Sequence, residues 1–281
     1  MKKTQKRIIT INDISCIGKC SITVVHPILS SVGFETIILP TSLLSFHTAF
    51  DNFTFLDLTN EMENILNHWK YIDRKADALV SGYLANIKQV ELVKKTLKEY
   101  VNKDGLYILD PVMADNGKLY KGFPSTFPTY MKELVKLAHI IIPNITEACL
   151  LLNKEYKEHF SIDEIKEMSI ELSKLGPEIV IITGVEKDNS HLGASYYEKK
   201  NNTFYTYFSR KNNKIFHGTG DVFTSTFVAS YLNNKSLLDS LKIAVDFTYK
   251  CIKNATYLND DPRFGVPFEQ NIKYLIRKIG L

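Results

Sequence analysis

The sequence predicts an α/β fold with a central, largely parallel sheet flanked by helices. Short apolar runs rich in Ile and Val alternate with segments of helical periodicity, and this spacing is typical of right-handed crossover units that place strands in parallel. The apolar runs are nearly continuous, as expected for strands that helices cover on both faces. Because ligands bind beyond the carboxyl ends of the strands in such folds, we expect the functional residues there.

Composition narrows the class of protein. Of 281 residues, 44% are hydrophobic and 23% charged, which is ordinary for a globular protein, and we expect a single domain over residues 1–281 because no repeat or linker is evident. The net charge of +4 is small and the basic residues are scattered, which argues against a nucleic-acid partner. No apolar run is long enough for a membrane span or a signal peptide. Four cysteines without metal spacing indicate reduced thiols in a cytoplasmic protein.

The chain opens with a strand, a helix and a second strand. Residues 7–11 are a β-branched run that ends in an Asn-Asp pair, which predicts a strand and its carboxyl-end turn. A helical pattern over residues 19–32 stops at a glycine, and a strand is predicted over residues 35–39, before a proline. Residues 41–55 are polar and aromatic without a clean period, so we expect a functional loop there.

The middle of the chain continues the alternation. Helices are predicted over residues 58–72 and 90–101, and the apolar strands that follow them over residues 78–83 and 106–109. The next elements are, in order, a helix, a strand, two helices and a strand, over residues 127–137, 140–142, 145–152, 163–175 and 179–182. Alternating aromatic residues from 192 to 207 predict a hairpin near the sheet edge. Polar side chains follow the predicted strands at Asp13, Tyr83, Asp110, Asn144 and Thr183.

A glycine-rich run, His217-Gly218-Thr219-Gly220-Asp221, stands directly before a last apolar helical pattern. Glycines permit a tight turn, so the amides of Gly218, Thr219 and Gly220 can point at one spot together with the positive end of the helix dipole, and this favours an anion. A carboxylate beside an anion site is a poor choice for binding alone. It suits a base that deprotonates a hydroxyl for attack on a phosphoryl group. The alternative is an ordinary turn with an acidic first-turn residue.

Seven runs, spread over nearly the whole chain, together resemble the pyridoxal/pyridoxamine kinases of the ribokinase-like superfamily. They are Thr10-Ile11-Asn12-Asp13-Ile14-Ser15, Gly33-Phe34-Glu35-Thr36, Ser45-Phe46-His47-Thr48, Ser81-Gly82-Tyr83, Asp110-Pro111-Val112-Met113-Ala114-Asp115, Pro143-Asn144-Ile145-Thr146-Glu147-Ala148 and the glycine-rich run. The last three are shared by the wider superfamily, and the first four point to vitamin B6 rather than a sugar. The resemblance implies a ribokinase-like three-layer α/β/α fold and ATP-dependent phosphorylation of the 5′-hydroxyl of pyridoxal, pyridoxamine or pyridoxine.

The resemblance also implies roles on the nucleotide side of the site. Asp221 is the expected base, and the amides of the glycine-rich run form its anion hole. Asp115 and Glu147 resemble an acidic pair serving Mg²⁺ and its water shell, which suits a hard ion shared with phosphates. Without the resemblance, Asp115 is a loop acid and Glu147 the far end of a capping box that begins at Asn144. The expected ATP contacts are Asn144, Thr183, Gly184, Tyr120, Gly218, Thr219 and Gly220.

On the substrate side, the matching positions are Asp13, Cys20, His47, Thr48 and Tyr83, beside Asp221. A flat heteroaromatic ring needs an aromatic side chain to lie against and polar groups at its edge, and Tyr83, His47 and Thr48 supply those types. A structural loop histidine is the alternative for His47. Many relatives have Ser where Asp13 stands, so the group meeting the ring nitrogen or the 3-hydroxyl can carry a charge here.

Other functions stay open at this point. One is another kinase of the superfamily, acting on the hydroxymethylpyrimidine of thiamin synthesis or on a sugar or nucleoside. A function of a different class is non-catalytic binding of B6 or nucleotide. The expected partners are ATP and a B6 vitamer. The resemblance further implies a homodimer and leaves open whether a monovalent cation assists.

Overall fold

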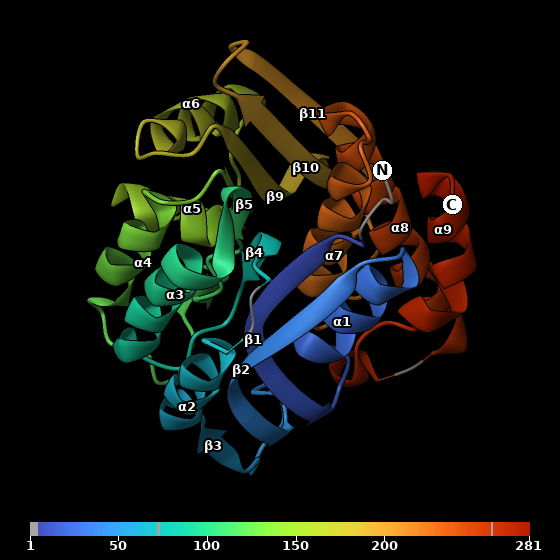
Figure 1. Ribbon diagram of the computed structural model, residues 1–281. Helices are drawn as coiled ribbons and strands as arrows, with labels where there is room; N and C mark the ends of the chain where they lie inside the picture. Colours follow the sequence, from blue (N-terminus) through green and yellow to red (C-terminus); the bar gives the residue numbers. More distant parts are fainter. Residues whose placement is uncertain (1–4, 72–73, 260) are drawn as a thin grey trace.

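The computed structural model describes residues 5–71, 74–259 and 261–281, and within these a nine-stranded sheet runs through the middle of the molecule (Figure 1). Its strand order is β11-β10-β9-β8-β5-β4-β1-β2-β3. The strands from β9 to β2 in this order are parallel, and antiparallel strands complete both edges. The strands are β1 (Arg7–Ile17), β2 (Glu35–Phe46), β3 (Phe55–Asp57), β4 (Ala76–Ser81), β5 (Val101–Leu109), β8 (Ile140–Ile141), β9 (Ile179–Asp188), β10 (His191–Glu198) and β11 (Thr203–Arg210).

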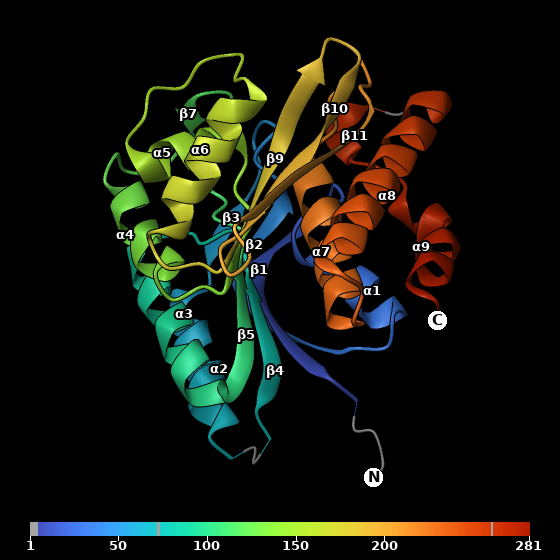
Figure 2. The same ribbon diagram turned by 90° about the horizontal axis from the view of Figure 1, so that it is seen from above.

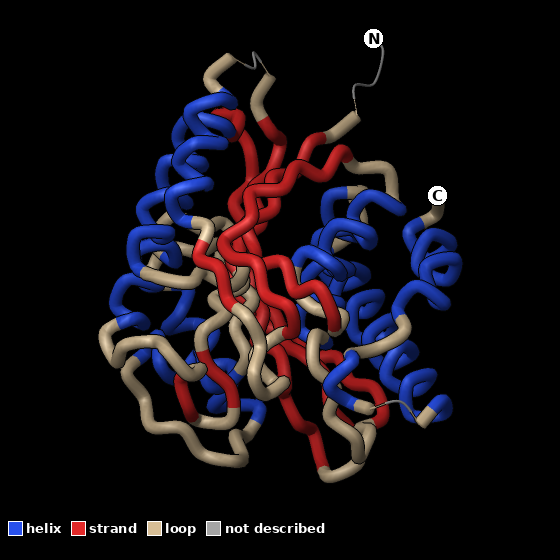
Figure 3. The backbone as a smooth tube through the Cα atoms, turned by 90° about the horizontal axis from the view of Figure 1, so that it is seen from below, coloured by secondary structure: helices blue, strands red, loops and turns tan. Residues whose placement is uncertain are grey.

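Helices cover both faces of this sheet, as Figures 2 and 3 show. One layer holds α1 (Ile22–Ser31), α7 (Thr219–Leu232), α8 (Leu237–Leu258) and α9 (Ile272–Ile279). The other holds α2 (Thr59–Trp69), α3 (Ile87–Tyr100), α4 (Phe127–Val135), α5 (Ile145–Leu152) and α6 (Ile162–Ser173). A small hairpin, β6 (Ala114–Asp115) and β7 (Lys118–Leu119), stands apart from the sheet, and the 3-10 turns η1 (Pro262–Phe264) and η2 (Phe268–Asn271) precede α9.

Each face of the sheet has its own hydrophobic core. Neighbouring residues of a strand point to opposite faces, so Ile8 packs with Val24 and Phe227 on one side while Ile9 joins Leu66 and Val93 on the other. All of these side chains are almost completely buried. The predicted three-layer α/β/α fold with a largely parallel central sheet is therefore confirmed. No helix in the described ranges is long and apolar enough to cross a bilayer.

The main departures from the predicted elements lie near the start of the chain. The first strand does not turn at Asn12-Asp13; a register shift there lets β1 continue to Ile17, opposite Phe46 of β2. The predicted loop over residues 41–55 is wrong for its first part, because β2 runs to Phe46 with β1 on one side and β3 on the other. Strand pairing supplies hydrogen bonds that the local period does not reveal.

Two further boundaries differ for local reasons. Helix α1 begins at Ile22, because Gly18 (φ 93°) and Ser21 (φ 51°) have left-handed backbone conformations that cannot belong to a helix. Helix α2 is described to Trp69, and the predicted end at Ile72 lies outside the described residues. Helices α8 and α9 follow the last predicted element.

Candidate active site

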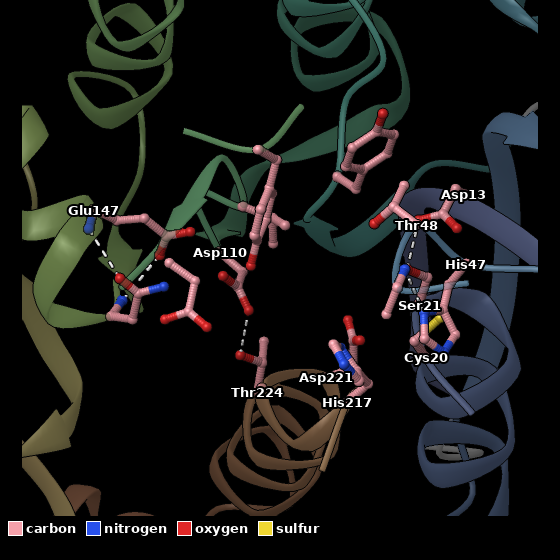
Figure 4. A pocket seen from close by; sticks show the side chains of 18 of the residues that line it. Asp13, Cys20, Ser21, His47, Thr48, Asp110, Glu147, His217, Asp221 and Thr224 are labelled. Atoms are coloured by element: carbon pink, nitrogen blue, oxygen red, sulfur yellow. Dashed lines mark hydrogen bonds between the residues drawn. The ribbon is translucent and has the colours of Figure 1, made fainter. Parts of the chain in front are cut away.

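A cavity of about 380 Å³ lies at the carboxyl ends of the parallel strands, where the start of α7 faces β1 and β2 (Figure 4). It brings together thirteen of the predicted site residues: Asp13, Cys20, His47, Thr48, Tyr83, Asp115, Tyr120, Asn144, Glu147, Thr183, Gly218, Gly220 and Asp221. Thr219 and Gly184 do not line it. The side chain of Thr219 instead donates to the carbonyl of Phe216, and Gly184 lies within β9 with a left-handed backbone conformation at φ 76°.

The two glycines before α7 serve different purposes. Gly218 caps the helix at φ 74°, and a Cβ at this position would lie 1.9 Å from the carbonyl oxygen of Lys19, so the fold itself requires glycine. A Cβ at Gly220 would meet no protein atom within 4 Å. The space beside Gly220 is therefore open to a ligand, at a helix N-terminus whose amides favour an anion.

Asp221 stands in the first turn of α7 and faces the cavity (Figure 4). Burial, together with the charges of Asp110 and Asp13, raises the pKa of its carboxyl to about 7, although the Ser21 backbone N–H favours the charged form. A carboxylate with a pKa near neutrality accepts a proton efficiently at physiological pH. This environment therefore suits the predicted base.

Ser21 is a site residue that the sequence analysis missed. It lines the cavity in a strained, left-handed conformation just before α1. Its hydroxyl donates to Asp13 Oδ1 at 2.5 Å, while its backbone N–H serves Asp221. A serine before an apolar helical run is a recognised helix-start signal. That signal could have located Ser21, although not its two partners.

Asp110 and Thr224 form a second pair within the cavity. Asp110 follows β5 and is 9% exposed, and the Thr224 hydroxyl of α7 donates to its Oδ2 at 2.6 Å. Burial raises the pKa of Asp110, and with the opposing effect of this hydrogen bond the pKa is about 6. Asp110 was predicted to follow a strand, but no role was predicted for it. Thr224 lies inside an apolar helical pattern, and nothing in that pattern indicates a site residue.

Glu147 is held by the predicted capping box at the start of α5. Its Oε2 accepts the Asn144 backbone N–H at 2.9 Å, and its Oε1 accepts the Met113 N–H at 3.0 Å. Asn144 Oδ1 accepts the Glu147 N–H, and Asn144 Nδ2 donates to the Ala114 carbonyl at 2.8 Å. The box thus ties the loop after β5 to α5. Burial, and then the charge of Asp110, raise the pKa of Glu147 well above its ordinary value.

The cavity wall is strongly acidic. Asp13, Asp110, Asp115, Glu147 and Asp221 line it, and Lys121 is the single Lys or Arg among the described lining residues. No three His, Cys, Asp or Glu side chains of the described ranges are close enough together to hold a metal ion by themselves. Carboxylates in this number fit Mg²⁺ that keeps waters and shares its coordination with phosphates, rather than an ion caged by protein alone.

His47 is fixed by its ring nitrogens. Its Nε2 lies 2.5 Å from the carbonyl oxygen of Arg263, and its Nδ1 lies 3.3 Å from the backbone N of Ala49. A carbonyl accepts and an N–H donates, so Nε2 carries the proton and Nδ1 accepts; this tautomer follows from the hydrogen-bond pattern. His47 therefore ties the loop after β2 to η1 and offers the cavity its ring, which lies 5.1 Å from that of His217.

The other predicted substrate-side groups differ in character. Burial raises the pKa of Tyr83 to about 12, and its ring lies 5.7 Å from that of Phe123. Burial also raises the pKa of the Cys20 thiol, as do the charges of Asp13 and Asp221, so this thiol is protonated at neutral pH. Tyr83 offers a half-buried aromatic wall. Cys20 offers a small apolar surface rather than a nucleophile.

The sequence matches the phosphomethylpyrimidine kinase family over residues 61–263. A hydroxymethylpyrimidine/phosphomethylpyrimidine kinase of Aquifex aeolicus is 31% identical over 178 residues, which are 63% of this chain and 67% of that protein. A pyridoxine kinase of Bacillus subtilis is 26% identical over 183 residues, 65% of this chain and 66% of that protein. A Bacteroides thetaiotaomicron protein assigned as a phosphomethylpyrimidine kinase, in a crystal form with pyridoxal, has a TM-score of 0.93 and 36% identity, covering 97% of this chain and 96% of that one.

These relatives confirm the resemblance to pyridoxal kinases of the ribokinase-like superfamily. They support kinase activity. They divide, however, between vitamin B6 and hydroxymethylpyrimidine, so the choice of alcohol has to be argued from the site.

Proposed function

This chain belongs to the phosphomethylpyrimidine kinase family, and from that membership we propose that it transfers the γ-phosphoryl group of ATP to the 5′-hydroxyl of pyridoxal, pyridoxamine or pyridoxine. The observation that carries the proposal is the pairing of Asp221, with its pKa of about 7, and the open anion site beside Gly220 on the same helix turn. A base and an anion hole side by side have no use in a protein that only binds. They suit transfer of a phosphoryl group to a hydroxyl.

In the proposed reaction, Asp221 accepts the hydroxyl proton as the oxygen attacks the γ-phosphorus. The amides at the start of α7 stabilise the charge on the transferred group, because they are aimed at it before the reaction begins. Asn144 and Thr183, which pair in a β-bridge partway along β9, line the cavity with Tyr120, and we assign these three residues to the nucleotide phosphates.

Mg²⁺ is part of this proposal. When bound with ATP, it neutralises charge on the phosphates. Asp110, Asp115 and Glu147 are the acids on its side of the cavity, and Asp115 is the most accessible of the three, because its residue is exposed while Asp110 and Glu147 are buried. The excess of acids over basic groups in the wall supports the need for a cation, since ATP adds further negative charge.

A B6 vitamer is favoured as the alcohol by two observations. The Bacteroides thetaiotaomicron structure that holds pyridoxal is similar along almost the whole of this chain, at 36% identity. The substrate side of the cavity also combines an aromatic wall at Tyr83 with polar groups at Asp13 and Thr48, which suits a flat, polar-edged ring. The second candidate alcohol, hydroxymethylpyrimidine, is favoured by the Aquifex aeolicus relative at 31% identity.

The test is ADP release from Mg·ATP with pyridoxal, pyridoxamine, pyridoxine or hydroxymethylpyrimidine, each supplied separately, with parallel reactions lacking Mg²⁺. We expect turnover with the B6 vitamers, its loss without Mg²⁺, and a phosphate ester on the 5′-hydroxyl. Turnover with the pyrimidine alone would identify hydroxymethylpyrimidine, and not a B6 vitamer, as the substrate. If the ligands stabilise the protein but none of the four gives ADP release, the protein is a binding protein and not a kinase.

A further inference from the structure

Asp13 is a buried acid at the substrate end of the cavity, with no cationic partner in the part of the chain that the structure describes. The residue is 5% exposed, yet it lines the cavity. Its Oδ1 accepts from the Ser21 hydroxyl at 2.5 Å, and its Oδ2 accepts from the Ser15 hydroxyl at 3.0 Å. Each oxygen retains a lone pair. A buried carboxylate without a counter-charge is costly, so a ligand that supplies one is bound with advantage.

Among the described residues, His47 is the one basic side chain whose charge affects the pKa of Asp13, and it does not bond to that acid. The electrostatic influence of His47 reaches Asp13, but both of its ring nitrogens are used, by the Arg263 carbonyl and the Ala49 N–H. Neither ring nitrogen is therefore free to bond to Asp13. Lys121 belongs to the segment after β7, beside Tyr120 and the nucleotide side of the cavity. Asp13 is therefore left for the ligand.

Two serine hydroxyls prepare Asp13 for this task. Burial raises the pKa of its carboxyl, and the hydrogen bonds from Ser21 and Ser15 act in the opposite direction because they favour the charged form. Burial is the larger effect, so the charged form needs a further donor; a ring N–H against Asp13 would supply a charge-assisted hydrogen bond, which is shorter and stronger than a neutral one. Figure 4 shows Asp13 and Asp221 on different sides of the same space.

We propose that Asp13 selects a heteroaromatic alcohol whose ring nitrogen carries a proton when it binds, an inference that rests on the proposed function. In B6 vitamers and in hydroxymethylpyrimidine alike, a ring nitrogen lies meta to the carbon that bears the hydroxymethyl group. One ring can therefore present its N–H to Asp13 and its hydroxyl to Asp221. A serine at this position would instead donate to an unprotonated nitrogen. Residue 13 thus sets the protonation state of the bound ring, and the 3-hydroxypyridine of the B6 vitamers reaches the required state readily as its dipolar form.

The first experiment reads the ring directly. Pyridoxine is titrated with the wild-type protein and with Asp13→Ser in the absence of ATP, and the absorption spectrum of the bound ligand, which differs between the ring-protonated and uncharged forms, is recorded. We expect the ring-protonated form on the wild type, at a pH where the free ligand is partly uncharged, and the uncharged form on Asp13→Ser. An uncharged ring on the wild type, or a protonated ring on the variant, would overturn the proposal.

The second experiment measures selectivity. Calorimetry compares pyridoxine with its carbocyclic analogue, in which C–H replaces the ring nitrogen, and hydroxymethylpyrimidine with the corresponding C–H compounds. The wild type should prefer the nitrogen compound of at least one pair by roughly 10- to 100-fold, the effect of a hydrogen bond to a charged group, and Asp13→Ala should lose that preference. The control is Asp246→Asn, which removes a carboxylate on α8 that lies outside the cavity and accepts a hydrogen bond from Tyr207 of β11. It should keep the preference.

The two proposals fail separately. Binding of a protonated ring without any ADP release would contradict the kinase and leave the role of Asp13 standing. Turnover with no preference for a ring nitrogen in any pair would contradict the role of Asp13 and leave the kinase.

Discussion

Alanine at Gly218 and at Gly220 should have opposite consequences, although the two residues are separated by one position. At Gly218, an L-residue in the left-handed region costs roughly 1–2 kcal/mol. In addition, the new Cβ would lie 1.9 Å from the Lys19 carbonyl, so either α7 or the Gly18–Lys19 segment has to move. We expect Gly218→Ala to lower the melting temperature by several degrees, at roughly 2–4 °C per kcal/mol for a chain of this size.

Gly220→Ala should fold at least as well as the wild type. Its Cβ meets no protein atom within 4 Å, and Ala in place of a helical Gly contributes up to roughly 0.5–1 kcal/mol. The methyl group would nevertheless occupy the space where the phosphoryl group approaches the amides. The loss of one anion-hole contact predicts a fall in kcat of roughly 10²-fold.

The assay for this pair combines thermal unfolding, followed by circular dichroism, with ADP release at saturating Mg·ATP and vitamer. Two outcomes would contradict this expectation. Full turnover by Gly220→Ala would mean that the space beside Gly220 is not the phosphoryl site. A destabilisation of Gly220→Ala as large as that of Gly218→Ala would mean that the open space is not there.

Three further predictions concern the acids and the capping box. Because the pKa of Asp221 is about 7, kcat/KM should rise with pH through an acidic limb centred near pH 7; a profile that is flat through this range would speak against Asp221 as the base. The folded-state pKa of Asp221 lies above the unfolded value of 3.8, so this group costs the wild type stability as pH rises from about 4 through about 7. Asp221→Asn should therefore melt at a higher temperature than the wild type at pH 8 and at nearly the same temperature at pH 4. An equal difference in melting temperature at both pH values would contradict this. Asn144→Ala should reduce the free energy of unfolding by about 1 kcal/mol and raise KM for ATP, measured by urea unfolding and steady-state kinetics, whereas an unchanged KM would remove Asn144 from the nucleotide site.

Local features of the site could be predicted from the sequence. The turn before α7 and the capping box of Asn144 and Glu147 depend on neighbouring residues, so their chemistry is visible in short runs. The parallel sheet was likewise predictable, because strand and helix periods alternate along the chain. These features place the base, the anion site and the acidic wall at one edge of the sheet.

Long-range features were not predictable. The extension of β1 past Asn12 depends on pairing with β2, and its register shift turns a predicted turn residue, Asp13, into a buried acid. The hydrogen bond of His47 joins residues 216 positions apart, and that of Thr224 to Asp110 spans 114. Ser21 adopts a conformation that serine rarely has, because two acids from other elements need its hydroxyl and its N–H.

The turnover of Asp221→Asn tests the proposed base most directly. ADP release is measured with saturating Mg·ATP and pyridoxine, and ATP binding to the same variant is measured by calorimetry. We expect turnover to be abolished while the affinity for ATP stays close to that of the wild type, because the carboxamide keeps its place on α7 and cannot accept the hydroxyl proton. Near-normal turnover by Asp221→Asn would contradict the assignment of the base and, with it, the proposed mechanism.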